Sequence, residues 1–235
     1  MNDNELKIEV SDCLRPESIF KKVPASELRL DDDFLKYEPE TKAEKAFKKL
    51  VKKAIKKGLK DFWRPVYDPC FNEDNTGICY VSGKESARCR EYNWWVKKAK
   101  DFCPELGSRI GTKSEYVAFL AVLIKELVAS GKSLEWAWEA VCLNSKELGH
   151  YWNSDNSKHN FEDTGSREVC GFYDLANTCK LLAEDKDAGG HWLAGGCCVD
   201  RGSEKPLAGL YHFDDPDDSH GGSCGWLVLD SCPEC

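Results

Sequence analysis

The sequence predicts an α+β fold, and the order of signals along the chain of 235 residues leads to it. Capping signals and helical periodicity mark three helices before about Gly149. From about Asn153 onward helix signals become rare, glycine becomes frequent, and short apolar runs bounded by glycines are typical of strands. Helices followed by short strands and long loops indicate α+β rather than alternating α/β.

Residues 1–62 are expected to form an N-terminal arm and an amphipathic helix that could serve as an attachment module. Residues 1–40 are polar, contain prolines and carry an acidic run, so irregular structure is expected there. A capping box from Thr41 to Glu44 begins the helix. Apolar residues then follow on one face at helical spacing: Ala43, Ala46, Phe47, Leu50, Val51, Ala54 and Ile55.

The opposite face of this helix carries lysines: Lys45, Lys48, Lys49, Lys52, Lys53, Lys56 and Lys57. Such a face could dock on phosphates or on a partner in a phage particle. The alternative, which we favour, is the solvated face of an ordinary helix.

Residues 62–106 are rich in aromatic residues, cysteine and turn formers, and predict loops and short strands. Two helices follow. Thr112 and Glu115 form a second capping box, which begins a helix that is apolar on nearly every side and ends at Gly131. Ser133 caps the next helix, which is expected to end at Gly149.

Charge and hydropathy exclude several classes of protein. A net charge of −8 disfavours general binding of nucleic acids, which requires a basic surface. No run of 18 apolar residues occurs, so membrane insertion is not expected, and the charged first 30 residues show no signal peptide. The expected location is therefore cytoplasmic or virion-associated.

The thirteen cysteines and the acidic segment show no clear metal or nucleophile pattern. Without a signal peptide a disulfide framework is disfavoured, and most cysteines are expected to be small buried hydrophobic residues. The CxxC at Cys232 and Cys235 has no second pair at zinc-ribbon spacing, and GxSxG, HExxH and P-loop motifs are absent. The carboxylates of residues 214–218 could bind calcium, but they lack the alternating ligand spacing, so we expect no cofactor and a solvated loop.

Four segments in order resemble the formylglycine-generating-enzyme family, a branch of the C-type lectin fold. "GSRIGTKSEYVAFLAVL" (107–123) is similar to the family's G-x-R-L-P-T-x-x-E-[WY], and "GHYWNS" (149–154) to Y-P-W-G-N. "GFYDLANTCKLL" (171–182) is similar to G-L-Y-D-M-x-G-N-V-x-E-W, and "GWLVL" (225–229) to G-F-R-V-V. The resemblance implies a C-type lectin-like domain over residues 63–235, with two helices packed on short antiparallel sheets and long loops.

The chain also departs from this family. Gly111 stands where the family has proline, and Ala176 where it has glycine. The active enzymes use two cysteines shortly before the final segment, whereas Cys197 and Cys198 lie too far upstream and Cys224 has no partner at the matching spacing. The resemblance therefore implies the fold and argues against the oxidase chemistry, so we expect a protein that is not an enzyme.

A non-catalytic subset of this fold comprises the variable proteins of diversity-generating retroelements. In these, adenine-directed errors rewrite codons near the end of the gene, and mutated Asn codons cannot yield Lys, Glu, Gln, Met or Trp. Lys, Glu, Met and Trp together make up about a quarter of this chain. "CCVDRGS" (197–203) and "YHFDDPDDSHGGSCG" (211–225) contain none of the four, which suggests a diversified surface.

The resulting hypothesis is a phage or bacterial protein whose variable region, at about residues 190–226, binds a protein or glycan on a cell surface. Strands at residues 191–194 and 225–229 frame this region, with Trp192, Gly225 and Trp226 as scaffold. The alternatives are a cysteine oxidase like the formylglycine-generating enzymes, a structural phage component, or an ordinary polar surface loop. The predicted contact residues are Cys197, Cys198, Asp200, Arg201, Ser203, Tyr211, His212, Phe213, Asp214, Asp215, Asp217, Asp218, Ser219, His220, Ser223 and Cys224.

Overall fold

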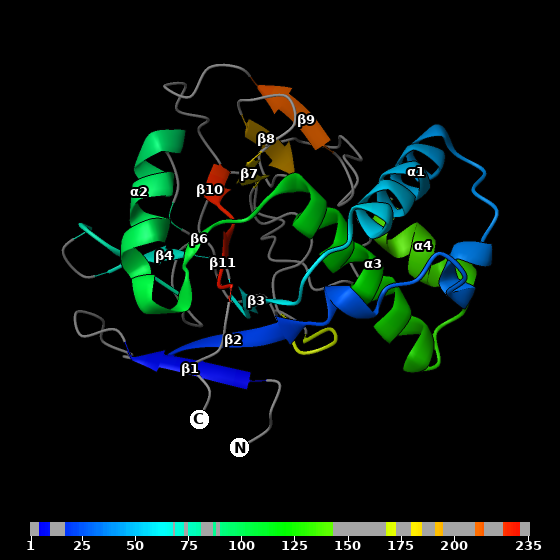
Figure 1. Ribbon diagram of the computed structural model, residues 1–235, viewed down its shortest axis with the longest axis horizontal. Helices are drawn as coiled ribbons and strands as arrows, with labels where there is room; N and C mark the ends of the chain where they lie inside the picture. Colours follow the sequence, from blue (N-terminus) through cyan, green and yellow to red (C-terminus); the bar gives the residue numbers. More distant parts are fainter. Residues whose placement is uncertain are drawn as a thin grey trace, which may run out of the picture.

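The computed structural model of the chain describes residues 5–9, 17–67, 69–72, 75–80, 87, 90–142, 168–172, 180–184, 191–194, 210–213 and 223–230. Within these residues it contains four α-helices and four small β-sheets, which confirms the predicted α+β class (Figure 1). None of the helices in the described part has the length and apolar character needed to cross a membrane.

The helices α1 (Lys42–Lys57), α3 (Lys113–Ala129) and α4 (Leu134–Cys142) lie together on one side of the molecule (Figure 1). Both predicted capping boxes are present. In each, the threonine hydroxyl (Thr41 or Thr112) accepts the N–H of the glutamate three residues later (Glu44 or Glu115), and the glutamate carboxylate accepts the threonine N–H. The predicted cap of α4 is also present, because the Ser133 hydroxyl accepts the Trp136 N–H at 3.1 Å. Helix α3 is buried on nearly all sides, as its sequence indicates.

The apolar face of α1 differs from the prediction at its start. Phe47, Val51 and Ala54 are buried as expected, but Ala43 and Ala46 are exposed. The buried residue of the first turn is instead Glu44, whose carboxylate accepts hydrogen bonds from the Thr41 and Glu40 amides and from the Tyr37 hydroxyl. Capping, and not apolar contact, therefore fixes this end of the helix.

Residues 62–106 were expected to form loops and short strands, and they do contain short strands at Phe62–Pro65, Cys70–Phe71 and Ile78–Cys79. The prediction was wrong for helix α2 (Tyr92–Phe102). The helix begins at Glu91 without a side-chain cap, and only Trp95 and Ala99, one turn apart, are buried. Tertiary packing of these two residues stabilises a helix that carries no start signal in its sequence.

The irregular arm expected over residues 1–40 is also a wrong prediction. Strands β1 (Glu5–Glu9) and β2 (Glu17–Val23) pair antiparallel, and β2 pairs in turn with β3 (Phe62–Pro65). Two 3-10 turns follow β2, at Ala25–Glu27 and Asp33–Lys36. Phe20 and Val23 belong to the same buried cluster as Phe47 of α1 and Trp226 near the end of the chain. The assignment of residues 1–62 to an attachment module stays a prediction.

Four strands in the described part of the C-terminal region form one sheet. Its order is β10 (Ser223–Gly225), β7 (Lys180–Glu184), β8 (His191–Ala194) and β9 (Leu210–Phe213). Strands β7, β8 and β9 are antiparallel neighbours, and β10 runs parallel to β7. Strand β8 has the bounds predicted from the sequence.

The apolar run at residues 225–229 was expected to form one strand, but the chain changes sheets at Trp226. Gly225 ends β10, whereas β11 (Leu227–Val228) pairs antiparallel with β6 (Arg109–Ile110). A separate hairpin is formed by β4 (Cys70–Phe71) and β5 (Ile78–Cys79). The short final run therefore joins two sheets of the molecule.

Candidate functional site

The pairing register brings three of the four ends of the candidate binding segments to one end of the four-stranded sheet. Ala194, the last residue of β8, pairs with Leu210, the first residue of β9, and with Leu181 of β7. Ser223, the first residue of β10, pairs with Lys180, the first residue of β7. We call this the Ala194 end of the sheet. The chain leaves the sheet there after Ala194 and rejoins it there at Leu210 and at Ser223, whereas Phe213, the last residue of β9, lies at the opposite end.

The described part of the chain includes five of the predicted contact residues as strand residues. Tyr211, His212 and Phe213 lie on β9, and Ser223 and Cys224 lie on β10. These two strands are the outer strands of the sheet, with β7 and β8 between them. At an ordinary strand spacing they are about 14 Å apart, so the two groups span a surface and not a single point.

The other predicted contact residues lie outside the described residues: Cys197, Cys198, Asp200, Arg201, Ser203, Asp214, Asp215, Asp217, Asp218, Ser219 and His220. The acidic segment considered for calcium is among them. Within the described ranges, no group of three or more His, Cys, Asp or Glu side chains is placed to hold a metal ion.

The predicted scaffold residues at the end of this region are buried. Trp226 is 2% exposed and makes edge-on ring contacts with Phe62 and Tyr116, at centroid distances of 6.0 and 5.2 Å. A Cβ on Gly225 would lie 2.8 Å from the Trp95 ring and 2.9 Å from Ile110, so this position accepts no larger residue without movement. Trp192, the third scaffold residue, lies on β8 with its backbone opposite His212.

Gly111 packs against the same tryptophan. Its N–H donates to the Trp226 carbonyl at 2.7 Å, and a Cβ at Gly111 would lie 2.5 Å from Cε3 of the indole. The Glu184 N–H donates to the Gly111 carbonyl at 2.9 Å, which joins the sheet to the start of α3. Glycine at position 111 therefore has a steric reason, since the backbone and the indole are in close contact.

Arg109 forms an ion-pair network that supports this region. Its guanidinium donates to both Glu115 oxygens, with one distance of 2.9 Å, and to Asp230 Oδ1 at 3.0 and 2.6 Å. Burial opposes ionisation of Glu115, but hydrogen bonds from Arg109 and Thr112 outweigh it and lower the pKa of this carboxyl. Every charge in the network has a partner, so its role is to hold the start of α3 against β11.

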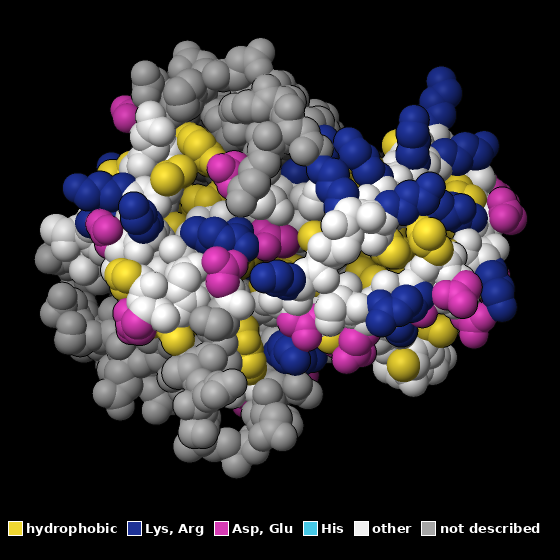
Figure 2. Space-filling view, in the orientation of Figure 1, with side chains coloured by type: hydrophobic (Ala, Val, Ile, Leu, Met, Phe, Trp, Pro, Cys, Tyr) yellow, Lys and Arg dark blue, Asp and Glu magenta, His cyan; other side chains and the backbone are white. Residues whose placement is uncertain are grey.

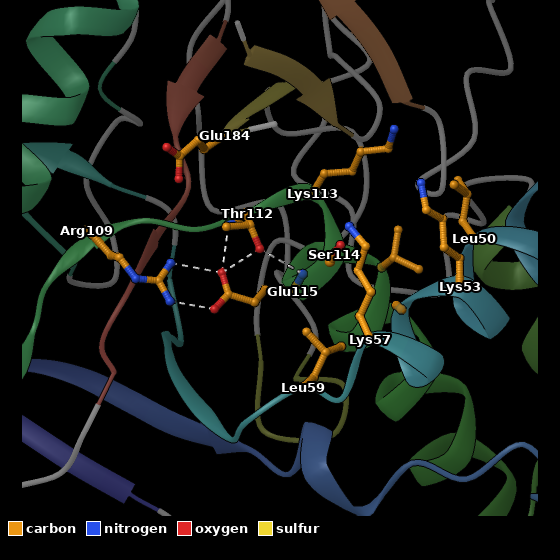
Figure 3. Close-up of a pocket in the computed structure, with 12 residues that line it drawn as sticks. Leu50, Lys53, Lys57, Leu59, Arg109, Thr112, Lys113, Ser114, Glu115 and Glu184 are labelled. Atoms are coloured by element: carbon orange, nitrogen blue, oxygen red, sulfur yellow. Dashed lines mark hydrogen bonds and ion pairs between the residues drawn. The ribbon is translucent and has the colours of Figure 1, made fainter. Parts of the chain in front are cut away.

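A pocket of about 300 Å³ lies between the C-terminal half of α1 and the start of α3 (Figure 3). Its apolar lining comes from Leu50, Ala54, Leu59 and Val117. Polar and charged lining residues are Lys53, Lys57, Arg109, Thr112, Lys113, Ser114, Glu115 and Glu184. The lysines make the pocket suited to an anionic group beside an apolar one.

No pattern in the sequence predicts this pocket. Lys53 and Lys57 belong to the lysine-bearing face of α1, and Lys113 and Ser114 carry no signal of a binding site. The Thr112 capping box does place Lys113 and Ser114 in the first turn of α3, but nothing in the sequence brings α1 next to that turn. Glu184, the last residue of β7, pairs with His191 at the end of the sheet opposite the Ala194 end. His191 also pairs with Phe213, so the pocket and the last residue of β9 lie at the same end of the sheet.

Two buried cysteines, Cys103 and Cys142, are unsuited to nucleophilic chemistry. Cys70, Cys79, Cys103 and Cys142 are buried, as predicted for small hydrophobic residues. Burial raises the pKa of Cys142 to about 12, and burial with the neighbouring Glu105 raises that of Cys103 to about 12. These two side chains are neutral thiols near pH 7, which suits packing and not nucleophilic chemistry.

Comparison of the chain with protein-family models, with curated proteins and with solved structures gave no match.

Proposed function

We propose that the protein binds a protein or glycan ligand on a cell surface, without catalysis, through residues 197–203 and 211–225. We further propose that its fold is of the C-type lectin type found in formylglycine-generating enzymes, and that retroelement mutagenesis diversifies these residues. One observation carries the proposal: two segments that lack Lys, Glu, Met and Trp connect or form strands of one sheet, and Gly225 and Trp226, at the end of the second segment, are buried.

This division suits a diversified surface. Gly225 and Trp226 are held by ring contacts and by close backbone packing, so substitution there disrupts the core. Segments that connect strands at the ends of a sheet tolerate substitution better, because less core packing depends on them. A fixed frame with variable connections is the arrangement by which antibody domains also present their binding loops.

The composition of these segments suits recognition of a macromolecule. Tyr211 and Phe213 can supply aromatic contact area at low entropic cost, and such residues dominate binding energy at interfaces. The carboxylates of residues 214–218 would favour cationic or hydroxyl-rich partners. A sheet that carries candidate residues on both outer strands offers a broad surface, as a protein or glycan requires.

The test of diversification is on DNA. A near-copy of the codons for about residues 190–226, located close to the gene and differing almost only at adenines, is the expected result. If the flanking DNA holds no such copy, the retroelement proposal is wrong.

The test of binding uses the protein. Joint substitution of Asp214, Asp215, Asp217 and Asp218 by Ser should weaken binding to the target cell surface and leave Tm nearly unchanged. Gly225→Val should lower Tm, because its side chain would collide with Trp95 and Ile110. A four-fold variant that binds as well as the wild type would contradict the proposed contact surface.

The variants Cys198→Ser and Cys224→Ser distinguish an oxidase from a non-catalytic binding protein. A protein that only binds a ligand should stay folded after both changes, whereas an oxidase would lose its activity. Copper-dependent oxidation of a cysteine-bearing peptide that disappears in these variants would favour the enzyme.

A second candidate function, attachment to a phage particle, is favoured by the lysine face of α1. Lys45, Lys49, Lys52 and Lys56 are exposed on this helix, and Figure 2 shows Lys and Arg side chains gathered over it. Charge reversal of these four lysines should abolish particle assembly if the helix docks on an acidic partner. Reversal of Lys132, on the turn after α3, is the matched control. Unchanged assembly would leave the face as an ordinary solvated surface.

A further inference from the structure

The β4–β5 hairpin places two cysteines directly opposite each other. Cys70 on β4 and Cys79 on β5 are partners in the antiparallel register, and their Sγ atoms are 3.2 Å apart. Both residues are at most 1% exposed. They form a small cluster of their own, apart from the main hydrophobic core.

The backbone geometry of this pair suits a disulfide bond. Residues directly opposite in an antiparallel pair have Cα atoms about 4.5–5.5 Å apart, within the range that a disulfide spans. The bond requires a sulfur–sulfur distance of about 2.05 Å, so the two sulfur atoms need approach by only about 1 Å, within the reach of side-chain rotation. Next to the pair, Asn72 N–H donates to the Gly77 carbonyl at 3.1 Å and Gly77 N–H donates to Asn72 Oδ1 at 2.7 Å.

The hairpin is short, although Ile78 of β5 belongs to the main hydrophobic core. Each of its strands has two residues, and an isolated two-stranded hairpin is only marginally stable in water. Its contacts with the rest of the molecule include the edge-on packing of Phe71 on Trp94, at 6.0 Å between centroids. A covalent link would hold the two strands in register independently of these contacts.

We propose that Cys70 and Cys79 form a disulfide bond that locks the β4–β5 hairpin, with glutathione disulfide as the oxidant. In this exchange the two thiols lose two protons and two electrons, one sulfur–sulfur bond forms, and the oxidant is reduced to two molecules of glutathione. This inference does not depend on the proposed binding function. It departs from the expectation, based on the lack of a signal peptide, that no disulfide stabilises the fold.

Peptide mapping of the full chain tests the bond directly. The protein is folded with glutathione and glutathione disulfide, remaining thiols are blocked with iodoacetamide, and trypsin then releases residues 61–84, since Arg64 precedes a proline. This peptide holds no cysteines besides Cys70 and Cys79, and cleavage after Glu73 separates them. The expected result is two fragments that stay joined until a reductant is added. Separate fragments that each carry the blocking group would overturn the proposal.

Thermal unfolding gives a second readout. Reductant should lower the Tm of the oxidised wild type by roughly 5–10 °C, the shift expected for opening a loop of this length. The Cys70→Ser/Cys79→Ser variant should show no response to reductant, whereas Cys170→Ser, the control, should respond as the wild type does. A wild-type Tm that is insensitive to reductant would overturn the proposal. So would reduced thiols that are protected by one zinc ion per chain.

Discussion

At the scale of the residue, Gly111 sets the distance between the start of α3 and the C-terminal core. Gly111→Ala should lower the free energy of unfolding by about 1–3 kcal/mol, because its Cβ would lie 2.5 Å from the Trp226 ring. Urea unfolding measures the change. The exposed Ala46→Ser is a control with little expected effect.

The cause of that effect can be isolated with a second variant. The contacted atoms, Cε3 and Cζ3, belong to the six-membered ring of the indole, and Phe lacks them. Gly111→Ala should therefore cost less in a Trp226→Phe background than in the wild type. An equal cost in both backgrounds would show that the indole contact is not the cause.

Glu115 makes stability depend on pH. Its folded-state pKa is lowered, so its contribution is present above its unfolded pKa of about 4.5 and is lost as the pH falls through the folded value. Glu115→Gln should lose about 1.5–3 kcal/mol of stability at pH 7, because Arg109 loses a charged partner.

Chemical denaturation from pH 7 down to pH 3 measures this dependence. The variant should show a flatter profile than the wild type in the acid range. Asp33→Asn, at a fully exposed pair with Lys36, is the control and should leave the profile unchanged. If the free energy of unfolding of the wild type and of Glu115→Gln changed in parallel from pH 7 to pH 3, Glu115 would not be the source of the pH dependence.

At the scale of the element, the capping boxes determine where α1 and α3 begin. Thr41→Ala should cost about 1 kcal/mol, and Thr112→Ala more, because the Thr112 hydroxyl also donates to Glu115 Oε2 at 2.9 Å. Thermal unfolding compares the two, with Thr112→Ser as the conservative control that keeps the hydroxyl. A Thr112→Ala variant as stable as the wild type would exclude the cap as the start signal.

The same elements show what the sequence could predict. The starts of α1, α3 and α4 follow from short-range signals, since Thr41, Thr112 and Ser133 each bond to amides within three residues. Helix α2 carries no such signal, and its two buried residues depend on the rest of the core. Local patterns therefore predict elements that begin with a cap, and miss those that only tertiary contact selects.

The candidate site divides in the same way. The segments around β9 and β10, and Trp226 beside them, could be predicted from the sequence, because the absence of Lys, Glu, Met and Trp from a segment can be recognised without a structure. The meeting of three segment ends at the Ala194 end of the sheet follows from strand pairing, because β10 pairs with β7 and not with β8 or β9. The pocket joins α1, α3 and β7, which are far apart in the chain, so no local pattern could have predicted it.

At the scale of the whole molecule, the first strands belong to the core. Phe20 is fully buried and contacts Tyr80 and Phe102, with ring centroids 5.7 and 5.8 Å away. Phe20→Ala should lower the free energy of unfolding by about 3–5 kcal/mol. Leu30→Ala, also in the N-terminal region but 47% exposed, should change it by less than about 0.5 kcal/mol. Equal effects in denaturant unfolding would indicate that the N-terminal strands are not part of the cooperative unit.

The positions of β1 and β9 have a practical consequence for how the protein can be presented. Figure 1 shows β1 at the bottom of the view and β9 at the top, with α3 and β3 between them. A molecule immobilised through a tag ahead of β1 would therefore hold β9 away from the support. On a sensor chip or a display particle, protein attached through such a tag should leave β9 accessible to large soluble ligands. Random coupling through lysines would instead place α1 against the support in many molecules.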